Sequence, residues 1–142
     1  MLKQENFSFK EKLNDILVVL TDWQREYNKI QSINMFDTIP EISTGLDILD
    51  KLRFQLTNIK IEFVNLQTKF EQKLKLYCYE HKYTKPTGAP NYDKLFAEKP
   101  QIYKIKTQID KIENLLTILN KDIDNRIKLI SRKLTGRIDG GF

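Results

Sequence analysis

The feature that most constrains the fold is a pair of apolar repeats of equal length. In the first repeat, large apolar side chains recur at alternating steps of three and four residues from Leu49 to Phe70, and after one shift the repeat continues to Tyr77. The second repeat follows the same rule from Ile102 to Ile123, and after a similar shift it continues to Ile130. This spacing places side chains on one edge of an α-helix and is typical of coiled coils. Each repeat covers four heptads, about 42 Å of helix at the usual rise per residue.

The two repeats predict two helices, residues 44–83 and 101–135, joined by a loop at 84–100. Thr44 is the expected N-terminal cap of the first of them, and Gly136 is a plausible end of the second. Two apolar edges of equal length can bury each other when the chain folds back, which favours an antiparallel hairpin. Three prolines and a glycine stand in the connection, and its order or disorder stays open.

A further helix is predicted before the hairpin, at residues 8–33. Ser8 followed by Glu11 indicates a capping box at its start, and one apolar stripe follows it at helical spacing. Pro40 is expected to block its continuation. The predicted fold is therefore all-α: a single helical domain over residues 1–142, formed by a long antiparallel coiled-coil hairpin with an additional N-terminal helix.

Near its end each repeat shifts by one residue, because Lys73 and Arg126 stand at positions where the spacing calls for an apolar side chain. Such a stutter relaxes the supercoil locally and leaves open whether Lys73 faces solvent or the seam. Further apolar side chains lie beside the seams and would be costly to expose. They favour a homo-oligomer, and the alternative is a wide three-helix core in a monomer. These side chains are Leu46, Ile48, Phe54, Ile61, Val64, Leu115 and Ile118.

The net charge of +5 is spread unevenly. Residues 1–43 carry 5 basic and 7 acidic side chains, whereas residues 102–142 carry 9 basic and 5 acidic. A basic half suggests a polyanionic partner, and the alternative is a solvated basic face. A lone cysteine, Cys78, permits no internal disulfide and fits a reducing compartment. Because no apolar run approaches the length of a membrane span, we expect a cytoplasmic protein with no membrane partner.

Sequence patterns that support catalysis are weak. His81 is the single histidine, so a histidine-based metal site or triad is not expected. No phosphate-binding loop of the GxxxxGK[ST] type occurs. The carboxylates of the last helix stand at helical spacing beside lysines, which indicates surface pairing. We predict no enzyme activity, no catalytic or metal-binding residues and no cofactor.

Two basic clusters are the strongest functional signal. Cations along a backbone and aromatic rings against bases are the common means of holding single-stranded nucleic acid. The nucleic-acid-binding residues predicted on this basis are Lys69, Lys73, Lys75, Tyr79, Lys82, Tyr83 and Lys85 in the first cluster, and Arg126, Lys128, Arg132, Lys133 and Arg137 in the second.

Tyr79 and Tyr83 are four residues apart and would share one outward face of a helix. Tyr77, in contrast, falls on the seam. The competing interpretation is that tyrosines close the end of the core and that cations offset the negative helix ends. In an antiparallel hairpin the two clusters would lie at opposite ends, about 40 Å apart, and could not form one site within a subunit.

Residues 73–79, K-L-K-L-Y-C-Y, resemble a signature of the phage recombination mediators called UvsY, which reads approximately K-A-R-L-D-Y-Y. Lys73, Lys75, Leu76 and Tyr79 match in type at the same spacing. Lysine stands where the family favours arginine at position 75, and cysteine replaces a tyrosine at 78. The resemblance covers roughly residues 49–140 and includes the stretch N-R-I-K-L-I near the end of the last helix.

The resemblance implies a helical protein that assembles into a ring-like homo-oligomer and binds single-stranded DNA. Such proteins help to load a RecA-like recombinase past a single-strand-binding protein, and they have no catalytic activity of their own. Lys73 and Lys75 would contact DNA, and the protein would act in the host cytoplasm if it is phage-encoded. The alternative function is a structural or adaptor subunit of a virion or another large assembly.

Overall fold

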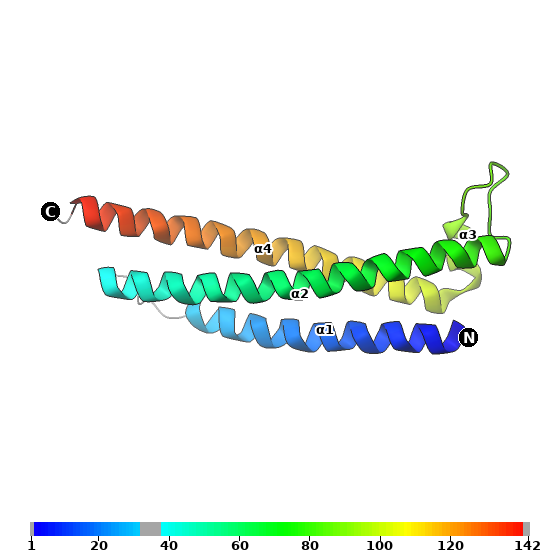
Figure 1. Cartoon of the computed structure of the whole chain (residues 1–142), viewed down its shortest axis with the longest axis horizontal. Helices are drawn as coiled ribbons and strands as arrows, with labels where there is room; N and C mark the ends of the chain where they lie inside the picture. The colour runs from blue at the N-terminus through cyan, green and yellow to red at the C-terminus, as the bar shows by residue number, and fades with distance from the viewer. Residues whose placement is uncertain (1, 32–37, 141–142) are drawn as a thin grey trace. The chain divides into compact units, whose positions relative to one another are not determined.

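The structure, a computed structural model, describes residues 2–31 and 38–140. The regular elements of this part of the chain are helices, coloured from blue to red in chain order (Figure 1), and the all-α prediction is confirmed. One isolated β-bridge joins Thr84 and Pro90. The helices are α1 (Leu2–Gln31), α2 (Ile39–Glu80), α3 (Tyr92–Glu98) and α4 (Pro100–Gly140).

The predicted start of the first helix is wrong. Helix α1 begins at Leu2, so Ser8 lies inside it and cannot be its N-terminal cap. The predicted end at residue 33 lies outside the described residues. Helix α4 likewise continues to Gly140 and passes through Gly136, which was the predicted end. Helical φ and ψ are open to glycine at a modest cost, so a single glycine need not end a helix.

Helix α2 begins five residues earlier than its predicted cap. The Thr38 hydroxyl accepts a hydrogen bond from the Glu41 amide, and the Glu41 carboxylate accepts one from the Thr38 amide, both at 3.3 Å. This reciprocal pair is a capping box. Pro40 falls in the first turn, where helices leave their amide groups unbonded, and is therefore tolerated. Thr44 is an interior residue whose hydroxyl donates to the Pro40 carbonyl, so the Thr44 cap is wrong.

Helix α2 ends at Glu80, so the predicted end at residue 83 is too late. The Tyr83 amide donates to the Cys78 carbonyl at 2.8 Å, and Lys82 adopts a left-handed φ of 60°. Together these features are a Schellman motif, which usually places glycine at the left-handed position. The predicted loop at 84–100 is not irregular throughout, because it contains α3, whose N-terminal cap is Asn91.

The chain divides into two compact units, each built from segments of α1, α2 and α4. Unit 1 comprises Met1–Leu17 and Ile61–Glu113, and therefore includes all of α3. Unit 2 comprises Val18–Lys60 and Asn114–Phe142.

In unit 1 each pair of long helices has a specific contact. The Phe9 and Phe70 rings of α1 and α2 meet edge to face with centroids 5.3 Å apart. The Gln67 amide of α2 donates to the Glu113 carboxylate of α4 at 2.9 Å. The Gln108 amide of α4 donates to the Asn14 side chain of α1 at 3.5 Å. The three helices of unit 1 therefore pack around one core.

In unit 2 each pair of long helices is also joined by a specific contact, and here these contacts are polar. The Trp23 indole of α1 donates to the Leu52 carbonyl of α2 at 2.8 Å, and the Tyr27 hydroxyl of α1 donates to the Asp122 carboxylate of α4. Arg53 of α2 lies 3.7 Å from Asp124 of α4. The Trp23 and Tyr27 rings stack with centroids 5.0 Å apart, and both residues are buried in the core of unit 2.

The predicted apolar repeats form the core of both units. Up to the stutters every position of the two repeats is buried: Leu49, Leu52, Leu56, Ile59, Phe63, Leu66 and Phe70 in α2, and Ile102, Ile105, Ile109, Ile112, Leu116, Leu119 and Ile123 in α4.

Of the apolar side chains expected beside the seams, Leu46 and Leu115 are half-buried. The others are exposed in the single chain, as predicted, and these are Ile48, Phe54, Ile61, Val64 and Ile118.

Candidate nucleic-acid interface

The two predicted basic clusters fall in different units. The first cluster, Lys69 to Lys85, lies in unit 1, and the second, Arg126 to Arg137, lies in unit 2.

Lys73 does not enter the seam at the stutter. Leu74 takes the buried position instead, and Lys73 is exposed. The Lys73 ammonium stands over the Phe9 ring of α1, 5.5 Å from its centroid, at a distance where a cation is attracted to the ring face. This contact holds the Lys73 stem against α1 while leaving its charge at the surface.

The other lysines of the first cluster are all exposed. Lys75 has no hydrogen-bonding or ionic partner among the described residues, and it lies two residues from Lys73, on a different face of α2. Lys69 and Lys73 are one helical turn apart and share a face. Lys82 and Lys85 lie beyond the end of α2. The cluster therefore surrounds the end of this helix rather than forming one line.

The prediction that Tyr79 and Tyr83 share one outward face of a helix is wrong. Tyr83 lies after the end of α2, and its ring stacks on Tyr77 with centroids 6.1 Å apart. Its hydroxyl donates to the Glu98 carboxylate at 2.7 Å. This hydrogen bond is the main reason why the pKa of Tyr83 is raised to about 12. Tyr83 thus ties the end of α2 to α3, and of the two rings only Tyr79 is exposed, with 48% of its surface accessible.

The half-buried Tyr77 closes the end of the α2 seam. Its ring lies against His81, with centroids 4.1 Å apart, as well as against Tyr83. The competing prediction that tyrosines close the core therefore describes Tyr77 correctly, and Tyr83 contributes to the same stack.

A second group of aromatic rings was not assigned to the site from the sequence. Tyr92 and Phe96 of α3 are near-parallel with centroids 6.4 Å apart, and Phe96 contacts Tyr103 of α4 at 5.6 Å. Leu95 is fully buried and anchors α3. The sequence does carry a signal for this group, because Tyr92 and Phe96 are four residues apart and have lysines nearby. The same pattern, however, equally indicates a small apolar cluster that docks on the tip of the hairpin.

Positive charge and aromatic rings both concentrate in this part of unit 1. Residues 66–106 contain nine lysines and four acidic residues, a balance of +5 that equals the charge of the whole chain. The same segment holds seven phenyl and phenol rings, of which Tyr79, Tyr92 and Tyr103 are exposed. Such a surface can attract a polyanion and offers ring faces to flat ligands.

The second cluster forms a smaller basic surface in unit 2. The Arg126 guanidinium stands 6.0 Å from the centroid of the Tyr27 ring. Arg126 and Lys133 border an open groove of about 350 Å³ on α4, together with Asp122, Asn125, Leu129 and Ile130. Lys128 and Arg132 are exposed, and the side chain of Arg137 lies outside the described part of the chain.

Few side chains in the described part of the chain are suited to act as nucleophiles or metal ligands. Burial raises the pKa of the Cys78 thiol, which disfavours the thiolate that a nucleophile or metal ligand needs. Among the described residues no three histidine, cysteine or carboxylate side chains gather closely enough to hold a metal ion. Within residues 2–31 and 38–140, none of the helices combines the length and apolarity required to cross a membrane.

In comparisons with known proteins, no family model, no curated protein and no solved structure matches the chain.

Proposed function

We propose that this protein is a non-enzymatic, self-associating protein that binds single-stranded nucleic acid through unit 1. The observation that carries the proposal is the concentration of exposed lysines and aromatic rings at residues 66–106. Lysines neutralise phosphates without regard to sequence, and rings at the same surface add stacking on unpaired bases. Single strands suit this surface better than duplexes, because only unpaired bases expose their faces.

The resemblance of residues 73–79 to the UvsY signature supports a narrower proposal. In this proposal the protein is a recombination mediator that uses Lys73 and Lys75 to hold single-stranded DNA while a RecA-like recombinase displaces a single-strand-binding protein. The α2 and α4 helices form the long antiparallel coiled-coil hairpin of that assembly. The surface position of both lysines supports this assignment. The expected activity is faster recombinase assembly on DNA that is already coated with a single-strand-binding protein.

The broader proposal is tested by fluorescence anisotropy with a labelled single-stranded oligonucleotide over a series of salt concentrations. We expect binding that weakens linearly, on logarithmic axes, as salt rises. Lys75→Ala should weaken binding and reduce the magnitude of that slope by about 0.7, the contribution of one phosphate contact on a single strand. Lys111→Ala, an exposed lysine of unit 1 outside the cluster, is the matched control and should change neither quantity by as much.

A protein that fails to bind the oligonucleotide at low salt would contradict the proposal. Binding that does not respond to salt would also contradict it, because phosphate contacts release counterions.

A second candidate function is a structural or adaptor subunit of a virion or another large assembly. The observation in its favour is the set of exposed large apolar side chains, such as Phe54 and Ile118, whose accessible fractions are 67% and 64%. Patches of this kind commonly mark protein–protein contacts. Large particles that form without nucleic acid, from a protein that ignores free oligonucleotides, would favour this function over nucleic-acid binding.

A further inference from the structure

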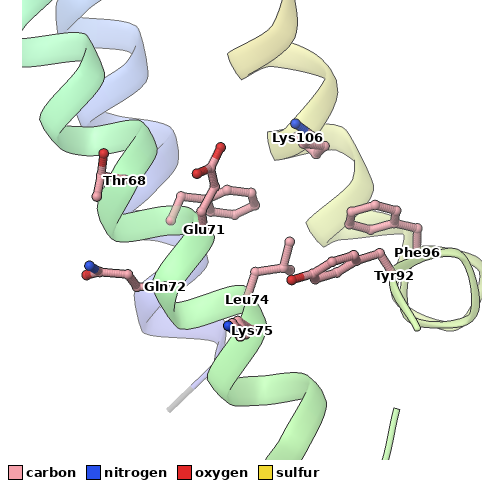
Figure 2. A pocket seen from close by; sticks show the side chains of 9 residues that line it. Thr68, Glu71, Gln72, Leu74, Lys75, Tyr92, Phe96 and Lys106 are labelled. Atoms are coloured by element: carbon pink, nitrogen blue, oxygen red, sulfur yellow. The ribbon is translucent and has the colours of Figure 1, made fainter. Parts of the chain in front are cut away.

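Unit 1 contains a groove of about 460 Å³ where α2, α3 and α4 meet. Phe70 and Leu74 of α2 form its buried floor. Figure 2 shows Tyr92 and Phe96 reaching from α3 toward α2, with Leu74 directed at the Tyr92 ring. The groove therefore has an apolar floor and one wall built from aromatic rings.

The aromatic wall is held in place by its surroundings. Tyr92 is the first residue of α3, which is capped by the Asn91 side chain and anchored by the fully buried Leu95. Desolvation is the main cause that raises the pKa of the Tyr92 phenol, in agreement with a ring that is partly shielded from water. Yet 36% of its surface stays accessible. A ring that is both fixed and accessible loses little entropy when a flat ligand stacks on it.

Charged groups border the groove on two sides. Lys75 of α2 has no hydrogen-bonding or ionic partner among the described residues, and Lys106 of α4 donates to Asp110 at 2.9 Å. Glu71 is the one carboxylate in the lining. The lining thus holds two cations and one anion within a segment of strong positive charge, so a ligand with a phosphate beside its flat group is complementary to it.

Polar groups complete the lining. Thr68 and Gln72 stand on α2 near Glu71. Carboxylate and amide side chains are the usual partners of the hydrogen-bonding edges of bases. The groove therefore offers ring faces for stacking, cations for phosphate, and acceptors and donors for a base edge.

We propose that this groove is a nucleobase site, in which one unpaired base of a single strand stacks on Tyr92 and its phosphate lies at Lys75. The inference rests on the proposed function and deepens it. It assigns the stacking to Tyr92 and Phe96 of α3, not to Tyr79 and Tyr83, and it assigns Glu71 to the base edge.

The test compares two oligonucleotides of equal length and charge, one with bases and one in which the central nucleotides are abasic. We expect the abasic strand to bind about 10-fold more weakly, which is within the contribution of stacking a single base. Tyr92→Leu, which keeps apolar volume but removes the flat ring, should abolish the difference. Tyr79→Leu is the matched control, because Tyr79 is exposed and does not line the groove; it should preserve the difference.

A direct readout comes from Tyr92→Trp. The fluorescence of the new indole should be quenched by the strand with bases but not by the abasic strand, whereas Trp23 lies buried in unit 2 and serves as an internal reference. Equal affinities for the two strands, or quenching by both, would overturn the groove proposal while leaving nucleic-acid binding intact. Binding of neither strand would overturn the proposed function itself, and the groove proposal with it.

Discussion

At the residue scale, the partners of single side chains decide which of them are available for binding. Tyr79 and Tyr83 look equivalent in the sequence, but Tyr83 donates its hydroxyl hydrogen to Glu98 and stacks on Tyr77. Lys73 and Lys75 also look equivalent, but Lys73 lies over the Phe9 ring. Lys75→Ala is therefore the cleaner test of a phosphate contact, since Lys73→Ala would also remove packing against α1.

The hydrogen bond of Tyr83 gives a prediction about pH. Because the pKa of Tyr83 is raised from 10.0 to about 12 in the folded protein, its contribution to stability is complete below pH 10. That contribution is lost as the pH rises from about 10 toward about 12, where the unfolded chain ionises first. An ultraviolet titration of phenolate absorbance should show a component with a pKa of about 12, and this component should vanish in Tyr83→Phe.

A titration in which Tyr83→Phe removes a component of ordinary pKa would contradict the Tyr83–Glu98 hydrogen bond. Glu98→Gln offers a second check, because an uncharged acceptor should return the pKa of Tyr83 toward its usual value.

At the scale of elements, the ends of the helices are set by capping groups that the apolar repeats do not reveal. Thr38 and Glu41 form the capping box that begins α2, three residues apart as the motif requires. At the other end of α2, Lys82 takes the left-handed position of a Schellman motif. The end of α2 at Glu80 places Lys82 and Lys85 of the first basic cluster outside the helix.

The capping box predicts different results for the cap residue Thr38 and for Thr44, which lies inside α2. Thr38→Ala should lower the free energy of unfolding by about 1 kcal/mol, because it leaves an amide of the first turn without its acceptor. Thr44→Ala, in the helix interior, should be neutral or slightly stabilising, since alanine is the better helix former there. Urea unfolding followed by helical circular dichroism measures both changes, and an equal loss in the two variants would contradict the assignment of the cap.

At the scale of the whole molecule, each unit packs its helices around its own core and leaves large apolar side chains at the surface. Among the described residues, Phe54 is the most exposed large apolar side chain of α2, and Ile118 and Leu129 are equally the most exposed of α4. Burying such side chains contributes about 1.5–3 kcal/mol each. The exposure agrees with the proposed self-association, which would remove these side chains from water.

Self-association through these side chains is measurable by analytical ultracentrifugation. We expect the unmodified protein to sediment as an oligomer, and Phe54→Ser combined with Ile118→Ser to shift the population toward monomer at the same concentration. Gln55→Ser, a change at an exposed polar neighbour, should leave the distribution unaltered. A monomeric unmodified protein at micromolar concentration would contradict this proposal.

The sequence by itself determined that the chain is helical and which edges of α2 and α4 are buried. Those properties follow from the spacing of residues within one helix, which is local, and every repeat position up to the stutters is buried as predicted. The start of α2 is also encoded locally, in the capping box of Thr38 and Glu41, although the predicted cap was Thr44.

Only the tertiary structure decided which aromatic rings remain accessible. Tyr83 meets a carboxylate fifteen residues away, and α3 brings Tyr92 and Phe96 to the side of α2 on which Leu74 and Lys75 lie. Such contacts join residues that are distant along the chain, so no periodicity in the sequence records them. The charge of the first cluster could be read from the amino-acid sequence, but the shape of its groove depends on how α3 docks.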